Sequence, residues 1–150
     1  MRLTTKGRYA VTAILDVALY ECNGPVSVSD VAERQGLSPS YLEKLFSNLK
    51  KKGLVSGRKG PGGGYKLTES SHLITIANVI DAVNETVDAT KCGGSKNCRG
   101  QGRCITHDLW AGLSNEIRNF LEGVSLSQLV SQQKNKTKIT NENILKSIKR

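Results

Sequence analysis

Long hydrophobic segments are missing from this sequence of 150 residues. Its first residues, MRLTTKGRYAV, contain no uninterrupted apolar stretch, so we expect no signal peptide. No apolar run approaches the ~18 residues that a membrane-spanning helix needs. We therefore expect a cytoplasmic protein without a membrane partner, in which the four cysteines stay reduced and clustered ones bind metal more readily than they form disulfides.

Patterns of catalytic residues are also missing. No arrangement of Ser, His and Asp and no pair of carboxylates suggests an enzyme. The glycine-rich segment KGPGGG lacks the GxxxxGK(S/T) pattern of a phosphate-binding loop, and it leads into an expected strand rather than a helix. The sequence therefore predicts a protein that is not an enzyme.

Positive charge is abundant and unevenly distributed. The formal net charge is +9, of which residues 1–70 carry +5, residues 71–130 carry −1 and residues 131–150 carry +5. A basic first half indicates a polyanionic partner, most simply nucleic acid, although general solubility is the alternative explanation.

Apolar periodicity predicts a helix-turn-helix near the N-terminus. Apolar residues at helical spacing predict helices over 5–22, 28–35 and 39–52. Ser38 is expected to cap the third helix, with Pro39 in its first turn. This order is typical of the helix-turn-helix of DNA-binding proteins: a short helix, a glycine turn, and a second helix whose exposed face has polar and cationic residues. The alternative is an ordinary amphipathic helix pair with a solvated face.

A basic hairpin follows the helix-turn-helix and favours duplex DNA. Strands are predicted at 54–58 and 65–67, with a glycine-rich tip between them. Glycines allow a backbone to approach a phosphate or to enter a narrow groove. The outward face of the 39–52 helix has Ser40, Lys44, Ser47 and Lys51. Tyr41, Glu43 and Asn48 flank this face, and Arg58 and Lys59 lie at the base of the hairpin.

The segment CGGSKNCRGQGRCITH predicts a metal site. Its pattern is Cys92-x5-Cys98-x5-Cys104-x2-His107, and its polar, glycine-rich filler offers little to bury. Zinc accepts three thiolates and an imidazole, but structural zinc ligands usually come as Cys-x2–4-Cys. The wider spacing suits a larger iron–sulfur core, so both metals stay open on the residues alone. A capping or solvent histidine is the alternative role for His107.

A helix after the Cys-rich segment predicts a dimer interface. After a helix over 75–84, apolar residues in a helix from Thr106 or Asp108 to about Gly123 recur at alternating steps of three and four. That spacing forms a seam for a second helix, which we expect in another copy of the chain, with packing on its own domain as the alternative. The seam residues are Trp110, Leu113, Ile117 and Phe120.

Four motifs in one order carry a family resemblance. The opening MRLTTKGRYAV, the helix PSYLEKLF, the hairpin KGPGGGYKL and the Cys-x5-Cys-x5-Cys-x2-His segment resemble those of the iron–sulfur cluster regulators, a family of bacterial winged helix-turn-helix transcription factors. The resemblance covers about residues 1–130. One departure is Lys59, which stands before GPGGG where relatives have arginine, because lysine cannot form arginine's bidentate fork.

The resemblance implies a homodimer that carries one 2Fe–2S cluster per subunit and receives it from the iron–sulfur cluster assembly machinery. Loaded with clusters, the protein would repress the operon for cluster biogenesis. The implied ligands are Cys92, Cys98, Cys104 and His107. The implied DNA-reading residues include Ser40, Tyr41 and Glu43 on the recognition helix and Pro61 and Gly62 in the wing. With the residues singled out above, the expected DNA contacts are Ser38, Ser40, Tyr41, Glu43, Lys44, Arg58, Lys59, Pro61 and Gly62.

These observations predict a mainly α fold with a small β-hairpin wing: a winged helix-turn-helix domain followed by a long dimerisation helix. We expect the DNA-binding domain at 1–84, the cluster-binding loop at 85–107, the dimerisation helix region at 108–130 and a disordered basic tail at 131–150. The predicted function is a cluster-sensing transcription regulator in which cluster state alters the choice of DNA site. The alternatives are a winged-helix regulator with structural zinc and an iron–sulfur carrier.

Overall fold

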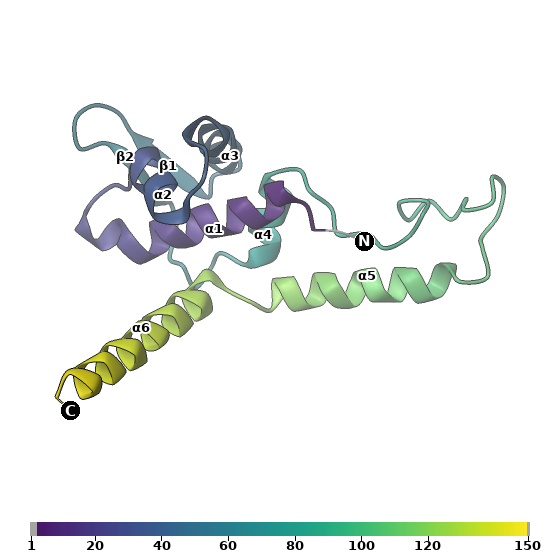
Figure 1. The fold of residues 1–150 in the computed structure, drawn as a ribbon. Coiled ribbons are helices and arrows are strands. Elements are labelled where there is room, and N and C mark those ends of the chain that lie inside the picture. The colour runs from purple at the N-terminus through teal and green to yellow at the C-terminus, as the bar shows by residue number, and fades with distance from the viewer. Residues whose placement is uncertain (1–2, 150) are drawn as a thin grey trace.

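The structure, a computed structural model, describes residues 3–149 of the chain. It is mainly helical, with one two-stranded antiparallel hairpin and a long C-terminal helix, which confirms the predicted fold class (Figure 1). None of the helices in the described range is long and apolar enough to span a membrane. The elements in order are α1 (Thr5–Tyr20), a 3-10 turn η1 (Glu21–Asn23), α2 (Val28–Gln35), α3 (Pro39–Lys51), β1 (Val55–Arg58), β2 (Gly64–Leu67), α4 (Ile76–Ala82), α5 (His107–Glu122) and α6 (Leu126–Ile148).

One hydrophobic core holds the N-terminal body, residues 3–84. α1 packs against both α3 and α4, and the side chains of Ile14, Leu42 and Phe46 are fully buried. The rings of Phe46 and Tyr65 stack at a centroid distance of 4.6 Å, which joins α3 to the hairpin. The predicted helix over 5–22 is shorter in the structure, because the chain tightens into the 3-10 turn after Tyr20.

Local capping and one buried carboxylate orient the helix-turn-helix. Ser27 caps α2 by accepting a hydrogen bond from the Asp30 N–H at 3.1 Å. Gly36, with φ of 65°, makes the left-handed turn after α2, which glycine adopts without strain. The Asp16 carboxylate is fully buried in α1 and accepts hydrogen bonds from Arg34 and Gln35 at the end of α2. These bonds tie the end of α2, and with it the turn that leads into α3, to α1.

The wing is a hairpin with the register Val55↔Leu67 to Arg58↔Gly64. Tyr65 also exchanges backbone hydrogen bonds with Val26, which ties the wing to the segment before α2. Gly64 has φ of 150°, and a Cβ there would lie 2.3 Å from the Val26 carbonyl oxygen. Only glycine fits this approach of the two backbones.

The C-terminal half leaves the body in two directions. α5 runs beside α4, and the segment 85–106, called the Cys loop below, lies around its far end (Figure 1). α6 begins under α1 and projects away from both the wing and the Cys loop (Figure 1).

The expectation of a disordered tail at 131–150 is wrong for residues 131–148, which belong to α6. Ser125 and Gln128 form a capping box that starts this helix, and no glycine or proline follows to end it. The polar composition suggested disorder because such a segment has few side chains to bury. Composition does not show, however, that a capping box starts a helix here and that no helix-breaking residue follows it.

Candidate metal centre and nucleic-acid interface

Three ligating atoms of the Cys-rich segment converge on one point. Cys92 Sγ and Cys98 Sγ lie 3.6 and 3.2 Å from His107 Nδ1, and the two sulfur atoms are 3.4 Å apart. His107 is the first residue of α5 and only 3% exposed, whereas both cysteines are half-buried in the loop. The helix therefore supplies a fixed imidazole, and the loop folds two thiols over it.

The fourth predicted ligand, Cys104, lies beside this trio rather than within it. Its Sγ is 3.7 Å from the Thr106 hydroxyl, and it lines a cavity of about 300 Å³ together with Cys98 and His107. Sequence reasoning placed four ligands in one site, and the structure brings together three of them, with Cys104 at the same cavity.

Hydrogen bonds favour the thiolate form at two of the cysteines. Burial raises the pKa of the Cys92 thiol, but hydrogen bonds from the Cys98 thiol and the Lys96 backbone outweigh it and lower the pKa to about 6. A hydrogen bond from the Thr106 hydroxyl lowers the pKa of Cys104. Because the thiolate is the form that ligates metal, these two groups are prepared for it.

The donor set fits a soft metal or an iron–sulfur cluster. Thiolates and imidazole select zinc, copper or iron–sulfur clusters over magnesium and calcium. Three donor atoms lie within 4.8 Å of one another, and a further thiol borders the adjoining cavity. This geometry accepts either of the two groups left open by the sequence.

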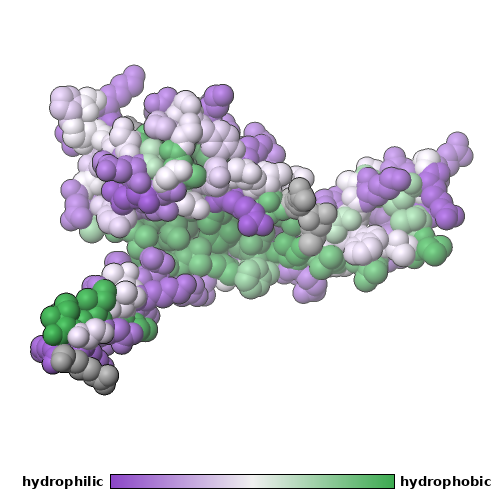
Figure 2. Space-filling view, in the orientation of Figure 1, coloured by the Kyte–Doolittle hydropathy of each residue, from purple (hydrophilic) through white to green (hydrophobic). Residues whose placement is uncertain are grey.

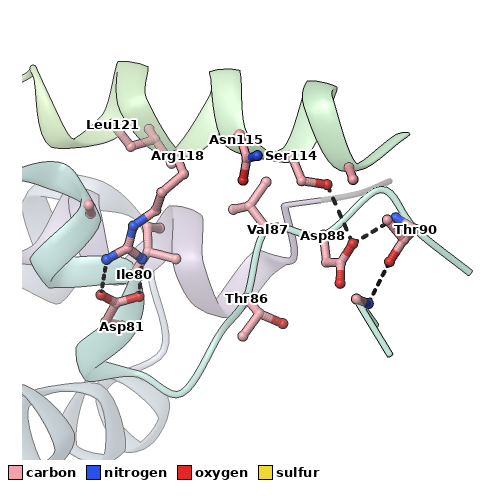
Figure 3. A pocket seen from close by; sticks show the side chains of 13 residues that line it. Ile80, Asp81, Thr86, Val87, Asp88, Thr90, Ser114, Asn115, Arg118 and Leu121 are labelled. Atoms are coloured by element: carbon pink, nitrogen blue, oxygen red, sulfur yellow. Dashed lines mark hydrogen bonds and ion pairs between the residues drawn. The ribbon is translucent and has the colours of Figure 1, made fainter. Parts of the chain in front are cut away.

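Polar contacts that sequence reasoning missed attach the Cys loop to α5 (Figure 3). The Asp88 carboxylate accepts a hydrogen bond from the Thr90 N–H at 2.7 Å, and its Oδ1 lies 3.4 Å from the Ser114 hydroxyl. Hydrogen bonds from Thr90 lower the pKa of Asp88, so this side chain is an anion. Asp-x-Thr is a recognisable turn pattern, but nothing in the sequence pairs it with a serine 26 residues away.

The residues predicted to contact DNA all lie on one part of the body. Tyr41 is half-buried, with its ring edge-on to Tyr9 at 5.9 Å, and the others are exposed. Ser38 stands at the N-cap position of α3, but its hydroxyl accepts no cap bond from the backbone and lies 3.0 Å from the hydroxyl of Ser40 instead. Lys66, exposed on β2 and not among the predicted residues, adds a further cation to the wing. The exposed predicted residues are Ser38, Ser40, Glu43 and Lys44 of α3 and its cap, and Arg58, Lys59, Pro61 and Gly62 of the wing.

The predicted dimer seam is an uncovered apolar face of α5. Trp110, Leu113 and Phe120 are 40%, 37% and 69% exposed, and Ile117 is half-buried. Leu109, at 63% exposure, belongs to the same face and was missed by the strict alternation of three and four. In the space-filling view the surface along α5 and the adjoining body is largely hydrophobic, whereas the wing and α3 are hydrophilic or neutral (Figure 2).

Comparison with known proteins gives a consistent match over most of the chain. The family model Rrf2, described as an iron-dependent transcriptional regulator, matches residues 3–132. The HTH-type transcriptional regulator IscR of Photorhabdus laumondii is 58% identical over 133 residues, which cover 89% of this chain and 81% of that protein. Residues of α6 beyond 132 lie outside the family match.

Two solved structures share the fold. T. potens IscR matches with a TM-score of 0.73 and 32% identity, covering 89% of this chain and 88% of that one. CymR, the global cysteine regulator of B. subtilis, matches with a TM-score of 0.75 and 27% identity, covering 88% of this chain and 98% of that one.

Proposed function

Because the chain belongs to the Rrf2 family of iron-dependent transcriptional regulators, we propose that it senses iron–sulfur clusters and binds operator DNA as a homodimer. Its target in the loaded state would be the operon for cluster biogenesis, which it would repress. The observation that carries the proposal is the convergence of Cys92, Cys98 and His107 on one point at the start of α5.

In this proposal Cys92, Cys98, Cys104 and His107 hold one 2Fe–2S cluster per subunit. When bound, such a cluster has less negative charge than one with four thiolates, and its neutral imidazole ligand makes it easier to lose. His107 would place one ligand on α5 itself, while the three thiolates come from the loop. Occupancy of the site would thereby be linked to the order of the loop next to α5.

The homodimer would form through the apolar face of α5. Leu109, Trp110, Leu113 and Phe120 are too exposed to belong to this chain's own core, and a second α5 would cover them. A two-fold dimer would place two copies of α3 in successive major grooves, roughly 34 Å apart. The two wings would then contact the flanking backbone through Arg58 and Lys59.

Glu43 is proposed to make site choice depend on cluster state. Its exposed carboxylate on α3 is repelled by phosphates, but it can accept a hydrogen bond from cytosine N4. Cluster-free protein would therefore bind sites that offer this donor, and loaded protein would tolerate sites that lack it. A ligand can shift such a preference only through its different affinity for two arrangements of the protein.

The Glu43 proposal is tested by fluorescence anisotropy with two operators that differ at this cytosine. Loaded protein, Cys92→Ala and Cys92→Ala/Glu43→Ala are titrated on both. The double variant should bind both operators about equally, whereas Cys92→Ala should prefer the one with cytosine. An unchanged preference in the double variant would place the discrimination elsewhere.

The cluster itself is tested by anaerobic purification with an absorption spectrum and counts of iron and sulfide. Visible absorption with two irons and two sulfides per chain, lost in Cys92→Ala and kept in Cys22→Ala, is the expected result. A colourless protein with one zinc per chain would favour the structural zinc alternative. A cluster-bearing protein without salt-dependent affinity for duplex DNA would favour a carrier.

A further inference from the structure

We propose that Ser114 and Asp88 are positioning residues that hold the segment before Cys92 against α5. The inference rests on the proposed function for the identity of the bound group, but not for the geometry. It assigns a role to two polar side chains that lie outside the expected ligand set and outside the DNA-reading surface.

Ser114 contacts the Cys loop through its hydroxyl. Its Oγ accepts a hydrogen bond from the Ala89 N–H at 2.8 Å and lies 3.4 Å from Asp88 Oδ1. The hydroxyl has one proton, which it donates either to the Trp110 carbonyl oxygen at 2.9 Å, as any serine within a helix can, or to Asp88 Oδ1. The contacts with Asp88 and Ala89 are what distinguish Ser114 from an ordinary solvent-facing serine.

Two further hydrogen bonds carry this attachment to Cys92. Asp88 accepts from the Thr90 N–H at 2.7 Å, and the Thr90 hydroxyl oxygen accepts from the Gly94 N–H at 2.8 Å. The first bond closes a turn before Cys92, and the second closes a turn that contains it. The backbone around Cys92 is thus held by a short series of contacts that begins at Ser114 on α5, and Figure 3 shows the contacts of Ser114, Asp88 and Thr90.

α5 is therefore a common frame for two ligands. His107 begins this helix, and Ser114 lies two turns, or about 10 Å, further along it. The part of the loop around Cys98 is held differently, because the Arg99 and Gly100 N–H groups bond to carbonyls of the loop itself. Cys104 is tied to the start of α5, since its carbonyl oxygen accepts a hydrogen bond from the His107 N–H at 3.1 Å. Cys98 is therefore the expected ligand whose position depends most on the loop itself.

α5 is in turn attached to the body close to Ser114. Arg118, one turn beyond Ser114, forms two hydrogen bonds of 2.6 and 2.8 Å with the Asp81 carboxylate of α4. Ser114 and Arg118 line one cavity of about 340 Å³ between α4, α5 and the start of the loop (Figure 3). Both partners of the ion pair are almost half exposed, so the pair sets orientation more than stability.

The test compares Ser114→Ala and Asp88→Ala with two controls. Ser114→Thr keeps a hydroxyl at the same place in the helix, and Ser131→Ala removes an exposed serine from α6. Cobalt(II) is titrated into each cluster-free protein, and thiolate-to-cobalt absorption reports the affinity. The half-life of the reconstituted cluster under a chelator and the thermal midpoint of the cluster-free protein are measured alongside.

Ser114→Ala and Asp88→Ala should bind cobalt about 10-fold more weakly and lose the cluster faster, with an unchanged thermal midpoint. Ser114→Thr and Ser131→Ala should resemble the wild type. Unchanged cobalt affinity, or weaker binding only in parallel with a lower thermal midpoint, would overturn the proposal.

The two proposals can fail separately. If the wild type binds cobalt but assembles no 2Fe–2S cluster, the proposed function fails, while a weakened Ser114→Ala still supports the positioning role. If the wild type binds no cobalt, the metal site is wrong and the positioning role is overturned with it. Cluster assembly with unchanged cobalt affinity in Ser114→Ala rejects only the positioning role.

Discussion

The body and the Cys loop differ in what holds them. In the body, side chains such as Ile14, Leu42 and Phe46 are fully buried, and several helices share one core. In the Cys loop, no residue from 86 to 106 is buried; Val87 packs against the edge of the core, and beyond it the loop is held by hydrogen bonds, thiol contacts and one exposed ion pair. A packed core needs no ligand to stay folded, whereas a loop of this kind gains order from whatever its side chains bind. The body is therefore a part that its own core keeps folded, and the Cys loop is a part whose order depends on what it binds.

The largest effect should come from breaking the core of the body. Phe46→Ala removes a fully buried ring that also stacks on Tyr65 of the wing. We expect a loss of about 3–5 kcal/mol in the free energy of unfolding, measured by denaturant titration. Leu73→Ala, at a side chain that is 66% exposed, should cost less than about 0.5 kcal/mol. Equal losses in the two variants would contradict the core.

A charge in the apolar face of α5 should break the dimer and leave the body folded. Leu113→Asp is expected to give monomers in analytical ultracentrifugation and to weaken operator binding about 10³-fold, towards the non-specific level. Asn119→Asp adds the same charge at an exposed position of α5 away from the seam, and it should stay dimeric. A stable dimer of Leu113→Asp would count against this interface.

Loss of one loop ligand should separate the two regions most clearly. Cys98→Ala is expected to abolish the cluster, as seen in iron and sulfide counts, because its thiol is one of the three converging groups. The free energy of unfolding of the body should change by less than about 0.5 kcal/mol, because Cys98 lies outside the core. Cys22→Ala, an exposed cysteine of the body, should keep the cluster. A full complement of iron and sulfide in Cys98→Ala would remove it from the ligands.

The smallest effect is expected at the wing. Arg58→Ala and Lys59→Ala should each lower the slope of log affinity against log salt concentration by about 1, because each removes one contact with a DNA phosphate. Lys146→Ala removes the same charge from α6, on the other side of the molecule, and should leave the slope unchanged. Unchanged slopes in both wing variants would exclude the wing from the DNA interface.

Much of the fold was predictable because it follows from local pattern. Apolar periodicity located α2 and α3 to within a residue, and the glycine-rich run located the tip of the wing. Boundaries were less accurate where the end of an element depends on its neighbours. The helix predicted over 75–84, for example, begins at Ile76 and ends at Ala82 in the structure. The chain then turns through Asn84, whose φ of 55° does not continue a helix.

The sequence indicated the residues of the candidate site but not their arrangement. Spacing alone indicated three cysteines and His107, since a polar loop has no packing reason to contain them. It did not indicate that Cys92 and Cys98 meet His107 while Cys104 lies beside them. Distances within a glycine-rich loop depend on contacts with other elements, and sequence spacing carries no information about those contacts.

The sequence by itself determined the helix-turn-helix, the hairpin of the wing and the positive charge of residues 1–70. These features come from periodicity, turn residues and charge, which are properties of neighbouring positions. Only the tertiary structure decided that Asp16 would hold the end of α2 and that Ser114 would meet Asp88. It also placed the buried Glu85 carboxylate against Gly7, where a Cβ would force that carboxylate to move. Each of these pairings joins residues far apart in the chain, and burial in a shared core or contact between separate elements brings them together.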